Sequence, residues 1–278
     1  MVLTFYQLRE QPFAATADAR YFFPGRTHRE ALASLLYGVN AGCGFLALIA
    51  PAGLGKTALL FDTLHYLRQS ARTAFQFQTP RAPLELIRSL LTNLGVKDAS
   101  GNFIRMQSRL HDVLVEQANL GKRVVVAIDE AQNLTRSTLE LLRMLTNFET
   151  AQEKLLQIIL SGQPRLAERI ASEDLLQLRQ RISIFAQLEP FSREETRFYI
   201  EHRLRVAGYA RKTPLFSREA LALIADGSRG VPRAINNLCL NALYNGCERK
   251  QHQISQEIIA QVIANLEPAR ASFSSPAA

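Results

Sequence analysis

The chain has 278 residues, 47% of them hydrophobic, so it can bury the core of one large domain or two smaller ones. It contains no apolar run of the roughly 20 residues that a membrane span needs, and its N-terminus lacks the charged-then-apolar order of a signal peptide. Its three cysteines form no metal-binding spacing, and we interpret them as reduced thiols of a cytoplasmic protein. The net charge of +8 permits binding to nucleic acid, but the basic residues are scattered and do not by themselves indicate it.

The N-terminal residues 1–25 are too rich in aromatic side chains for a disordered arm. We therefore predict that they pack on the domain that follows, which we place at residues 26–190. That domain is expected to open with a helix over residues 26–39, because apolar residues recur there at helical spacing.

The segment Ala50–Thr57, with the sequence APAGLGKT, lies between an apolar run and a helical pattern. A strand, a glycine-bearing loop and a helix in this order predict a phosphate-binding P-loop. Gly53 and Gly55 can adopt backbone angles that other residues resist, so successive N–H groups can point at one anion near the helix N-terminus. We predict that Lys56 reaches the outer phosphates of ATP and that the Thr57 hydroxyl ligates Mg2+.

The strict P-loop pattern has glycine at the position of Ala50. Alanine is tolerable there if its φ stays negative, and the alternative interpretation is a glycine-rich turn without a ligand. The residues predicted to bind the nucleotide are Pro51, Ala52, Gly53, Leu54, Gly55, Lys56, Thr57 and Ala58.

Strand and helix patterns alternate from the P-loop to residue 188, which predicts an α/β fold with a parallel five-stranded sheet flanked by helices. Ligands of such sheets bind outside the carboxyl ends of the strands, where the P-loop, Asp129 and Ser161 all fall. The expected strands are 44–49, 73–79, 122–128, 155–163 and 182–188; the expected helices are 57–69, 83–94, 106–120, 135–148 and 164–180, with a loop over 95–105.

A second motif ends the strand at 122–128, where consecutive apolar residues are followed by Asp129 and Glu130. Such a run suits a strand buried on both faces, and the two carboxylates match the Walker B pattern. Asp129 is predicted to hold Mg2+, and Glu130 to orient and polarise the attacking water. The alternative is that Asp129 caps a helix while Glu130 is solvated.

The pattern changes after Pro190. A capping box at Ser192 and Glu195 opens a helix, and further helical patterns follow without a strand signal. We predict a small helical lid over residues 191–267 and a disordered tail over 268–278.

A P-loop α/β domain followed by a helical lid resembles an AAA+ ATPase. Five segments narrow the resemblance to the ExeA/GspA-type ATPases of the general secretion pathway, whose relatives include secretion ATPases of exosortase loci and, further off, transposition ATPases of the TnsC/TniB kind. The similarity runs from about residue 3 to residue 267. The segments are FYQLREQPF (5–13), HREAL (28–32), DEAQNL (129–134), LLQIILSGQP (155–164) and GVPRAIN (230–236).

The resemblance implies further site residues. Arg233 matches the sensor-2 arginine that contacts the γ-phosphate, unless it caps its helix or pairs with Asp226. Arg179 and Arg181 lie where AAA+ proteins carry the arginine finger for a neighbouring subunit; we favour Arg181, and either can instead be a surface charge. Sensor 1 falls on Ser161 or Gln163. The segment around Pro12, Phe13 and His28 is expected to flank the adenine, although His28 also fits a packing role.

The resemblance also implies a homo-oligomer that assembles on ATP. Secretion-pathway members usually continue into a transmembrane helix and a peptidoglycan-binding domain, whereas this chain stops after the lid, so we expect the ATPase core alone. The first hypothesis is an ATPase that drives or times assembly of an export system. The alternatives are an ATPase that loads on duplex DNA and recruits a transposase, and a nucleotide-dependent switch with little hydrolysis.

Overall fold

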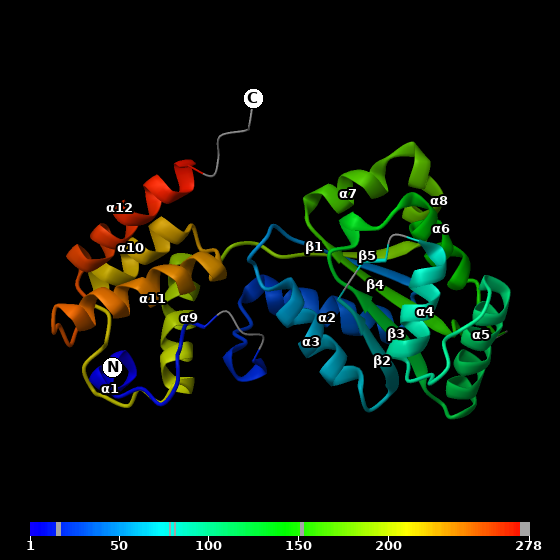
Figure 1. Cartoon of the computed structure of the whole chain (residues 1–278), viewed down its shortest axis with the longest axis horizontal. Helices are drawn as coiled ribbons and strands as arrows, with labels where there is room; N and C mark the ends of the chain where they lie inside the picture. Colours follow the sequence, from blue (N-terminus) through cyan, green and yellow to red (C-terminus); the bar gives the residue numbers. More distant parts are fainter. Residues whose placement is uncertain (15–17, 78, 81, 151–152, 273–278) are drawn as a thin grey trace. The chain divides into compact units, whose positions relative to one another are not determined.

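The computed structural model describes residues 1–14, 18–77, 79–80, 82–150 and 153–272, with side-chain burial described up to residue 266. The chain divides into two compact units (Figure 1). One is Arg26–Glu189, and the other joins Met1–Gly25 to Pro190–Ala278.

The first unit contains the parallel sheet that the sequence predicts. Its five strands follow the spatial order β2-β3-β4-β1-β5, and every neighbouring pair is parallel. The strands with apolar runs, β1, β3 and β4, are buried along nearly their whole length, as parallel strands covered on both faces must be. The strands are β1 (Phe45–Ile49), β2 (Ala71–Gln76), β3 (Arg123–Ile128), β4 (Leu156–Gly162) and β5 (Ile182–Gln187).

Helices cover the sheet in two groups (Figure 1). The first group is α2 (Arg26–Asn40) and α3 (Lys56–Leu67), which contact each other and the sheet. The second group, which packs on the main apolar core, is α4 (Pro83–Asn93), α5 (Phe103–Asn119), α6 (Arg136–Leu145), α7 (Pro164–Ala171) and α8 (Leu176–Arg179).

Several predicted boundaries in this unit were wrong, among them the following three. Helix α5 begins at Phe103, inside the predicted loop, because the side chain of Asn102 accepts a hydrogen bond from the Arg105 N–H and caps the helix. The helix predicted over 164–180 is interrupted at Ser172, which is extended and whose hydroxyl bonds to the Arg169 carbonyl. Strand β2 starts two residues early, in register with β3.

The second unit is helical, as predicted. Its core is formed by α9 (Arg193–Val206), α10 (Arg218–Ser228), α11 (Pro232–Glu248) and α12 (Gln256–Ser272), together with the short N-terminal helix α1 (Val2–Tyr6) and the turn η1 (Ala19–Tyr21). The predicted capping box opens α9, where Ser192 and Glu195 exchange both hydrogen bonds. Helix α12 extends to Ser272, so the first residues of the predicted tail are helical and residues 273–278 lie outside the described part.

The N-terminal segment belongs to this helical unit, whereas we expected it to pack on the domain that follows it in sequence. Tyr6 and Phe13 are buried in the helical core, and the Phe13 ring packs edge-on against Phe216. In Figure 1 the first residues run beside α9 and α11. The Phe13 ring is only 1% exposed, so it is enclosed by this core, and the role of the segment beside an adenine stays a prediction.

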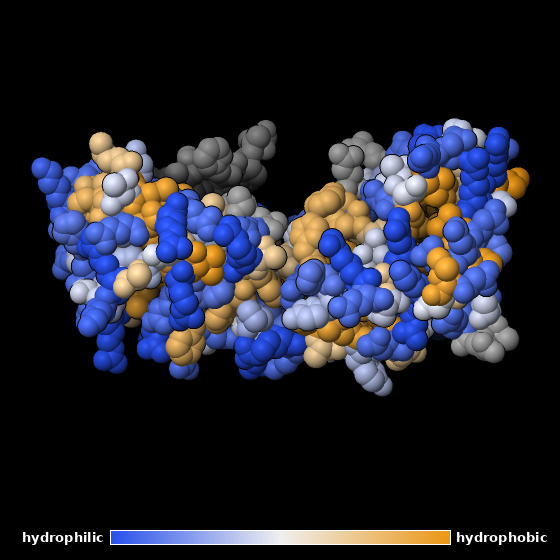
Figure 2. Space-filling view, turned by 90° about the horizontal axis from the view of Figure 1, so that it is seen from below, coloured by the Kyte–Doolittle hydropathy of each residue, from blue (hydrophilic) through white to orange (hydrophobic). Residues whose placement is uncertain are grey.

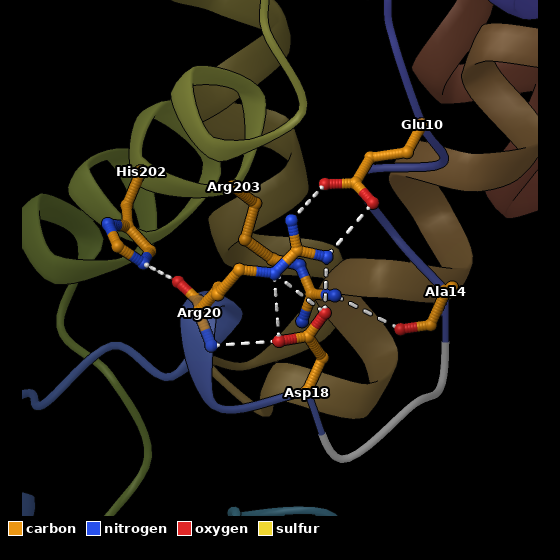
Figure 3. A network of polar contacts seen from close by, with 6 residues as sticks. All are labelled: Glu10, Ala14, Asp18, Arg20, His202 and Arg203. Atoms are coloured by element: carbon orange, nitrogen blue, oxygen red, sulfur yellow. Dashed lines mark hydrogen bonds and ion pairs between the residues drawn. The ribbon is translucent and has the colours of Figure 1, made fainter.

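A buried arginine ties this segment to α9 (Figure 3). Arg203 is 5% exposed, and its guanidinium donates to the backbone carbonyls of Pro12 and, at 3.0 Å, Ala14. It also donates to the Tyr199 hydroxyl at 2.9 Å and lies over the Tyr21 ring. Nearby, Arg20 pairs with both Glu10 and Asp18. Since the N-terminal carbonyls satisfy a buried cation, the segment is part of the core of this unit.

Candidate nucleotide-binding site

The loop between β1 and α3 has the backbone that the P-loop prediction requires. Gly53 and Gly55 adopt φ of 84° and 89°, the left-handed region that favours glycine. Helix α3 begins at Lys56 directly after Gly55, and no side chain caps its first turn. The free N–H groups and the dipole of a twelve-residue helix therefore point at the loop, which suits an anion.

Lys56 lies within this loop. Its side chain is 5% exposed, and its ammonium donates to the carbonyls of Ala50 at 2.9 Å and Pro51 at 3.2 Å. Ala50 is not among the described non-glycine residues with positive φ, so alanine is compatible with this position. The loop thus places one cation beside a set of backbone donors, a combination that binds phosphate.

Asp129 contacts the P-loop from the carboxyl end of β3. Its Oδ2 accepts a hydrogen bond from the Thr57 hydroxyl at 2.5 Å. Its Oδ1 accepts from the Ser161 hydroxyl and from the Glu130 N–H, both at 2.9 Å. Ser161 is fully buried, so its hydroxyl orients Asp129. The alternative in which Asp129 caps a helix is not seen, since no side chain caps the following turn η2 (Ala131–Asn133).

The residues present fit Mg2+. Thr57 and Asp129 offer a hydroxyl and a carboxylate oxygen at one point, which is the hard-oxygen chemistry that Mg2+ prefers. Within the described residues, no group of three or more His, Cys, Asp or Glu side chains is arranged to hold a metal. A Mg2+ site of few protein ligands, completed by phosphate and water, agrees with that finding.

Glu130 lies next to Asp129 in a strained conformation, with φ of 51°. Its Oε2 accepts from the side-chain amides of Gln132 and, at 3.3 Å, Gln163. The expectation that Glu130 is merely solvated is therefore not met, because its carboxylate is half-buried and bonded. Of the two sensor-1 candidates, Ser161 reaches Asp129 and Gln163 reaches Glu130.

His28 contacts the P-loop rather than standing apart from it. The side chain comes from the first turn of α2 and is 2% exposed. Its Nε2 lies 2.8 Å from the carbonyl oxygen of Leu54, so Nε2 is the donor. A Cβ on Gly55 would lie 3.4 Å from the same nitrogen. The ring therefore packs against the loop, in agreement with the packing role that the sequence analysis gave as an alternative.

The two finger candidates are not part of this cluster. Arg181 directly precedes β5, whose first residue, Ile182, pairs with Phe45 at the start of β1. Arg181 therefore lies at the amino edge of the sheet. The P-loop follows β1 at the carboxyl edge. The Arg181 guanidinium donates to the side-chain carbonyl of Asn147, while Arg179 is exposed at the end of α8.

Arg233 lies in the helical unit, one residue into α11. It is exposed, and within the described residues no ion pair or hydrogen bond of its side chain is found. Asp226, which the sequence offered as its partner, instead pairs with Arg193 at 2.7 Å. Among the residues of this unit that the structure describes, none therefore pairs with the guanidinium.

Comparisons with known proteins bear on the family resemblance and the fold. Residues 39–170 match the family model described as AAA domain. This part of the chain is similar to an AAA domain. The chain as a whole also has a curated relative. It is 35% identical over 255 residues, 91% of its length, to General secretion pathway protein A of Aeromonas hydrophila. The predicted resemblance to secretion-pathway ATPases is thus confirmed. The chain spans about half of that relative, 46% of its length.

Solved structures support the fold alone. The ORC2 protein of Aeropyrum pernix, in ADPNP-ADP complexes, superposes with a TM-score of 0.69 at 15% identity over 92% of this chain and 71% of that one. The structure of Drosophila ORC bound to DNA superposes with a TM-score of 0.68 at 17% identity, over 99% of this chain and 69% of that one. The Thermotoga maritima RuvB Holliday junction branch migration motor superposes with a TM-score of 0.56 at 18% identity, over 86% of this chain and 68% of that one. The likeness therefore supports the P-loop AAA+ fold for the chain.

Sequence reasoning missed two contacts in the site. Gln132 lies in the DEAQNL segment, yet no role was assigned to it, and the structure places its amide on Glu130. The contact of His28 with Leu54 was also not foreseen. Both contacts depend on where separate elements meet. The only signal in the sequence was for the first contact, since Gln132 is a polar residue close to the two carboxylates Asp129 and Glu130.

Proposed function

We propose that the protein binds ATP with Mg2+ and hydrolyses it to ADP and phosphate. The observation that carries this proposal is the contact of Thr57 with Asp129, which brings the P-loop and the Walker B carboxylates to one point. A simple anion-binding turn would not need an acidic pair there, whereas Mg2+ held by these oxygens would offset charge on the phosphates.

Each residue has a distinct proposed role. The loop N–H groups from Ala52 to Ala58 would hold the phosphates, and Lys56 would exchange its carbonyl partners for phosphate oxygens. Glu130 would accept the proton of the attacking water. Gln163 is our candidate for sensor 1, because its amide contacts Glu130, the proposed base, whereas Ser161 contacts Asp129.

Two arginines complete the proposed machinery. Arg233 is exposed and has no ion pair among the described residues, and as sensor 2 it would contact the γ-phosphate. Arg181 is our candidate finger: β5 has six residues, which separates Arg181 from the carboxyl edge of its own sheet by roughly 20 Å. At that distance Arg181 can serve only the site of a neighbouring copy, so we propose an ATP-dependent homo-oligomer.

The proposed cellular role is to drive or time assembly of a secretion or export system. It rests on the similarity to General secretion pathway protein A. Within the described chain, no helix has both the length and the apolar character required to cross a bilayer.

Loading on duplex DNA is a second candidate, favoured by the net charge of +8. Figure 2 shows hydrophilic side chains spread over much of the visible face of each unit, with smaller apolar areas between them, so hydropathy marks no single docking region on it.

Phosphate release tests the proposal. We expect wild-type activity that requires Mg2+ and that falls roughly 10²-fold or more in Glu130→Gln, the scale of a lost catalytic base, while ATP binding is retained. Normal hydrolysis by this variant would remove the role of Glu130. Repeating the assay with duplex DNA at two salt concentrations separates the two partners. Stimulation that weakens steeply with salt favours DNA, because phosphate contacts release counterions.

A further inference from the structure

The carboxylate of Glu130 is held on one side only. Both amides that contact it, from Gln132 and Gln163, donate to the same oxygen, Oε2. Over the part of the chain that the structure describes, no hydrogen bond reaches Oε1. One oxygen is thus fixed by the protein, and the other remains able to accept a hydrogen bond.

Gln132 is itself fixed at every polar atom of its side chain. Its Nε2 donates to Glu130, and its Oε1 accepts from the Gln163 N–H at 3.1 Å. Its backbone carbonyl accepts from the Arg169 guanidinium of α7. The amide therefore links the end of β3 to the end of β4, and its orientation is unambiguous because the N–H partner requires the oxygen.

Gly162 shows that the space for this amide is reserved. A Cβ at Gly162 would lie 2.8 Å from Gln132 Oε1, closer than real Cβ contacts allow. Gly162 is the last residue of β4 and has no positive φ, so glycine is not required there by its backbone angles. The absence of a side chain is explained by the approach of Gln132 and Leu166.

We propose that Gln132 is a positioning residue for ATP hydrolysis, an inference that rests on the function proposed above. By holding Oε2, it directs Oε1 to the attacking water. The water oxygen bonds to the γ-phosphorus, its proton passes to Oε1, and the bond to the β–γ bridging oxygen breaks, so that ADP leaves with the electron pair. Gln132 contacts neither water nor nucleotide and acts only through Glu130.

The test is Gln132→Met, which keeps the length of the side chain and removes both the oxygen and the nitrogen of its amide. We expect kcat to fall by about 10- to 100-fold, the range found when a partner that orients a reactive group is removed. KM and ATP affinity should stay within about twofold. The matched control is Gln69→Met, at an exposed glutamine of the same unit for which the described chain shows no side-chain hydrogen bond.

A double-mutant cycle separates positioning from a structural role. In a Glu130→Gln background, measured by single turnover, Gln132→Met should change the rate by less than about twofold, because there is no carboxylate left to orient. The same fold loss in both backgrounds, or a loss expressed in KM alone, would overturn the proposal. Circular dichroism and nucleotide binding confirm that the variants fold.

The result also distinguishes this inference from the proposed function. A wild type that releases no more phosphate than Lys56→Ala removes both. If the wild type hydrolyses ATP and Gln132→Met is equally active, only the positioning role of Gln132 is ruled out. Gln132→Asn, which keeps the amide but shortens the chain, should recover part of the rate if the amide is the active element.

Discussion

The hydroxyl of Thr57 donates to Asp129 across 72 positions of sequence, at 2.5 Å. This contact joins the first turn of α3 to the end of β3, and Ser161 fixes the other oxygen of the same carboxylate from β4. Three neighbouring elements therefore hold the candidate Mg2+ ligands before a nucleotide binds. Such preorganisation lowers the cost of ordering the site on binding.

Lys56→Ala should lose most ATP affinity. The ammonium already lies against the loop carbonyls, so its removal deletes the positive charge of a site built for phosphates. A lost charge-assisted contact is worth about 1.5–3 kcal/mol, or roughly 10- to 100-fold in Kd. Titration with a fluorescent ATP analogue measures it, and Lys122→Ala, at an exposed lysine, is the control. Unchanged affinity in a folded variant would contradict the P-loop assignment.

Arg181→Ala should bind ATP normally yet hydrolyse it poorly, because a finger acts on the site of a neighbour. A finger in trans is worth about 10³–10⁵ in rate. Mixing this variant with Lys56→Ala subunits should restore activity, since the latter still present an intact arginine. The same pair of measurements on Arg179→Ala decides between the two candidates. Specific activity that does not rise with protein concentration, together with no rescue, would leave both as surface charges.

His28→Leu should weaken ATP binding by about 3- to 10-fold, the scale of a single hydrogen bond of 0.5–1.5 kcal/mol. The physical reason is that Nε2 holds the Leu54 carbonyl and so restrains the loop. His28→Gln, which offers an N–H at a similar reach, should recover much of the affinity. Calorimetric titration of each variant with ATP is the measurement, with the exposed His65→Leu as control. Equal affinity in all four proteins would show that the contact does not restrain the loop.

Arg203→Met should lower the free energy of unfolding of the protein by about 2–4 kcal/mol, because it leaves the buried Pro12 carbonyl, the part-buried Ala14 carbonyl and the Tyr199 hydroxyl without this donor. Urea unfolding followed by circular dichroism measures this loss. Arg205→Met, two positions along α9 and exposed, should change stability by less than about 0.5 kcal/mol. Similar values for both variants would mean that the N-terminal segment does not depend on Arg203.

The parallel sheet and the phosphate-binding loop were predictable from the sequence because their signals are local. Buried apolar runs such as Val124–Ile128 must be covered on both faces of the sheet. Gly53 and Gly55 indicate a loop with positive φ angles, which other residues rarely adopt. The placement of Lys56, Thr57 and Asp129 at the carboxyl edge then follows from the parallel direction of the strands. Even the interruption of a helix at Ser172 was beyond this reasoning, since apolar spacing continues across it.

Which side chains meet was decided only by the tertiary structure. Strand order puts β4 between β3 and β1, and for that reason Ser161 reaches Asp129 while Gln163 and Gln132 converge on Glu130. The N-terminal segment carries an aromatic composition that demands burial but does not name its partner; the buried guanidinium of Arg203 supplies that partner in the helical unit. Periodicity and backbone preference act between neighbours in sequence, whereas these contacts depend on register and packing between elements far apart in it.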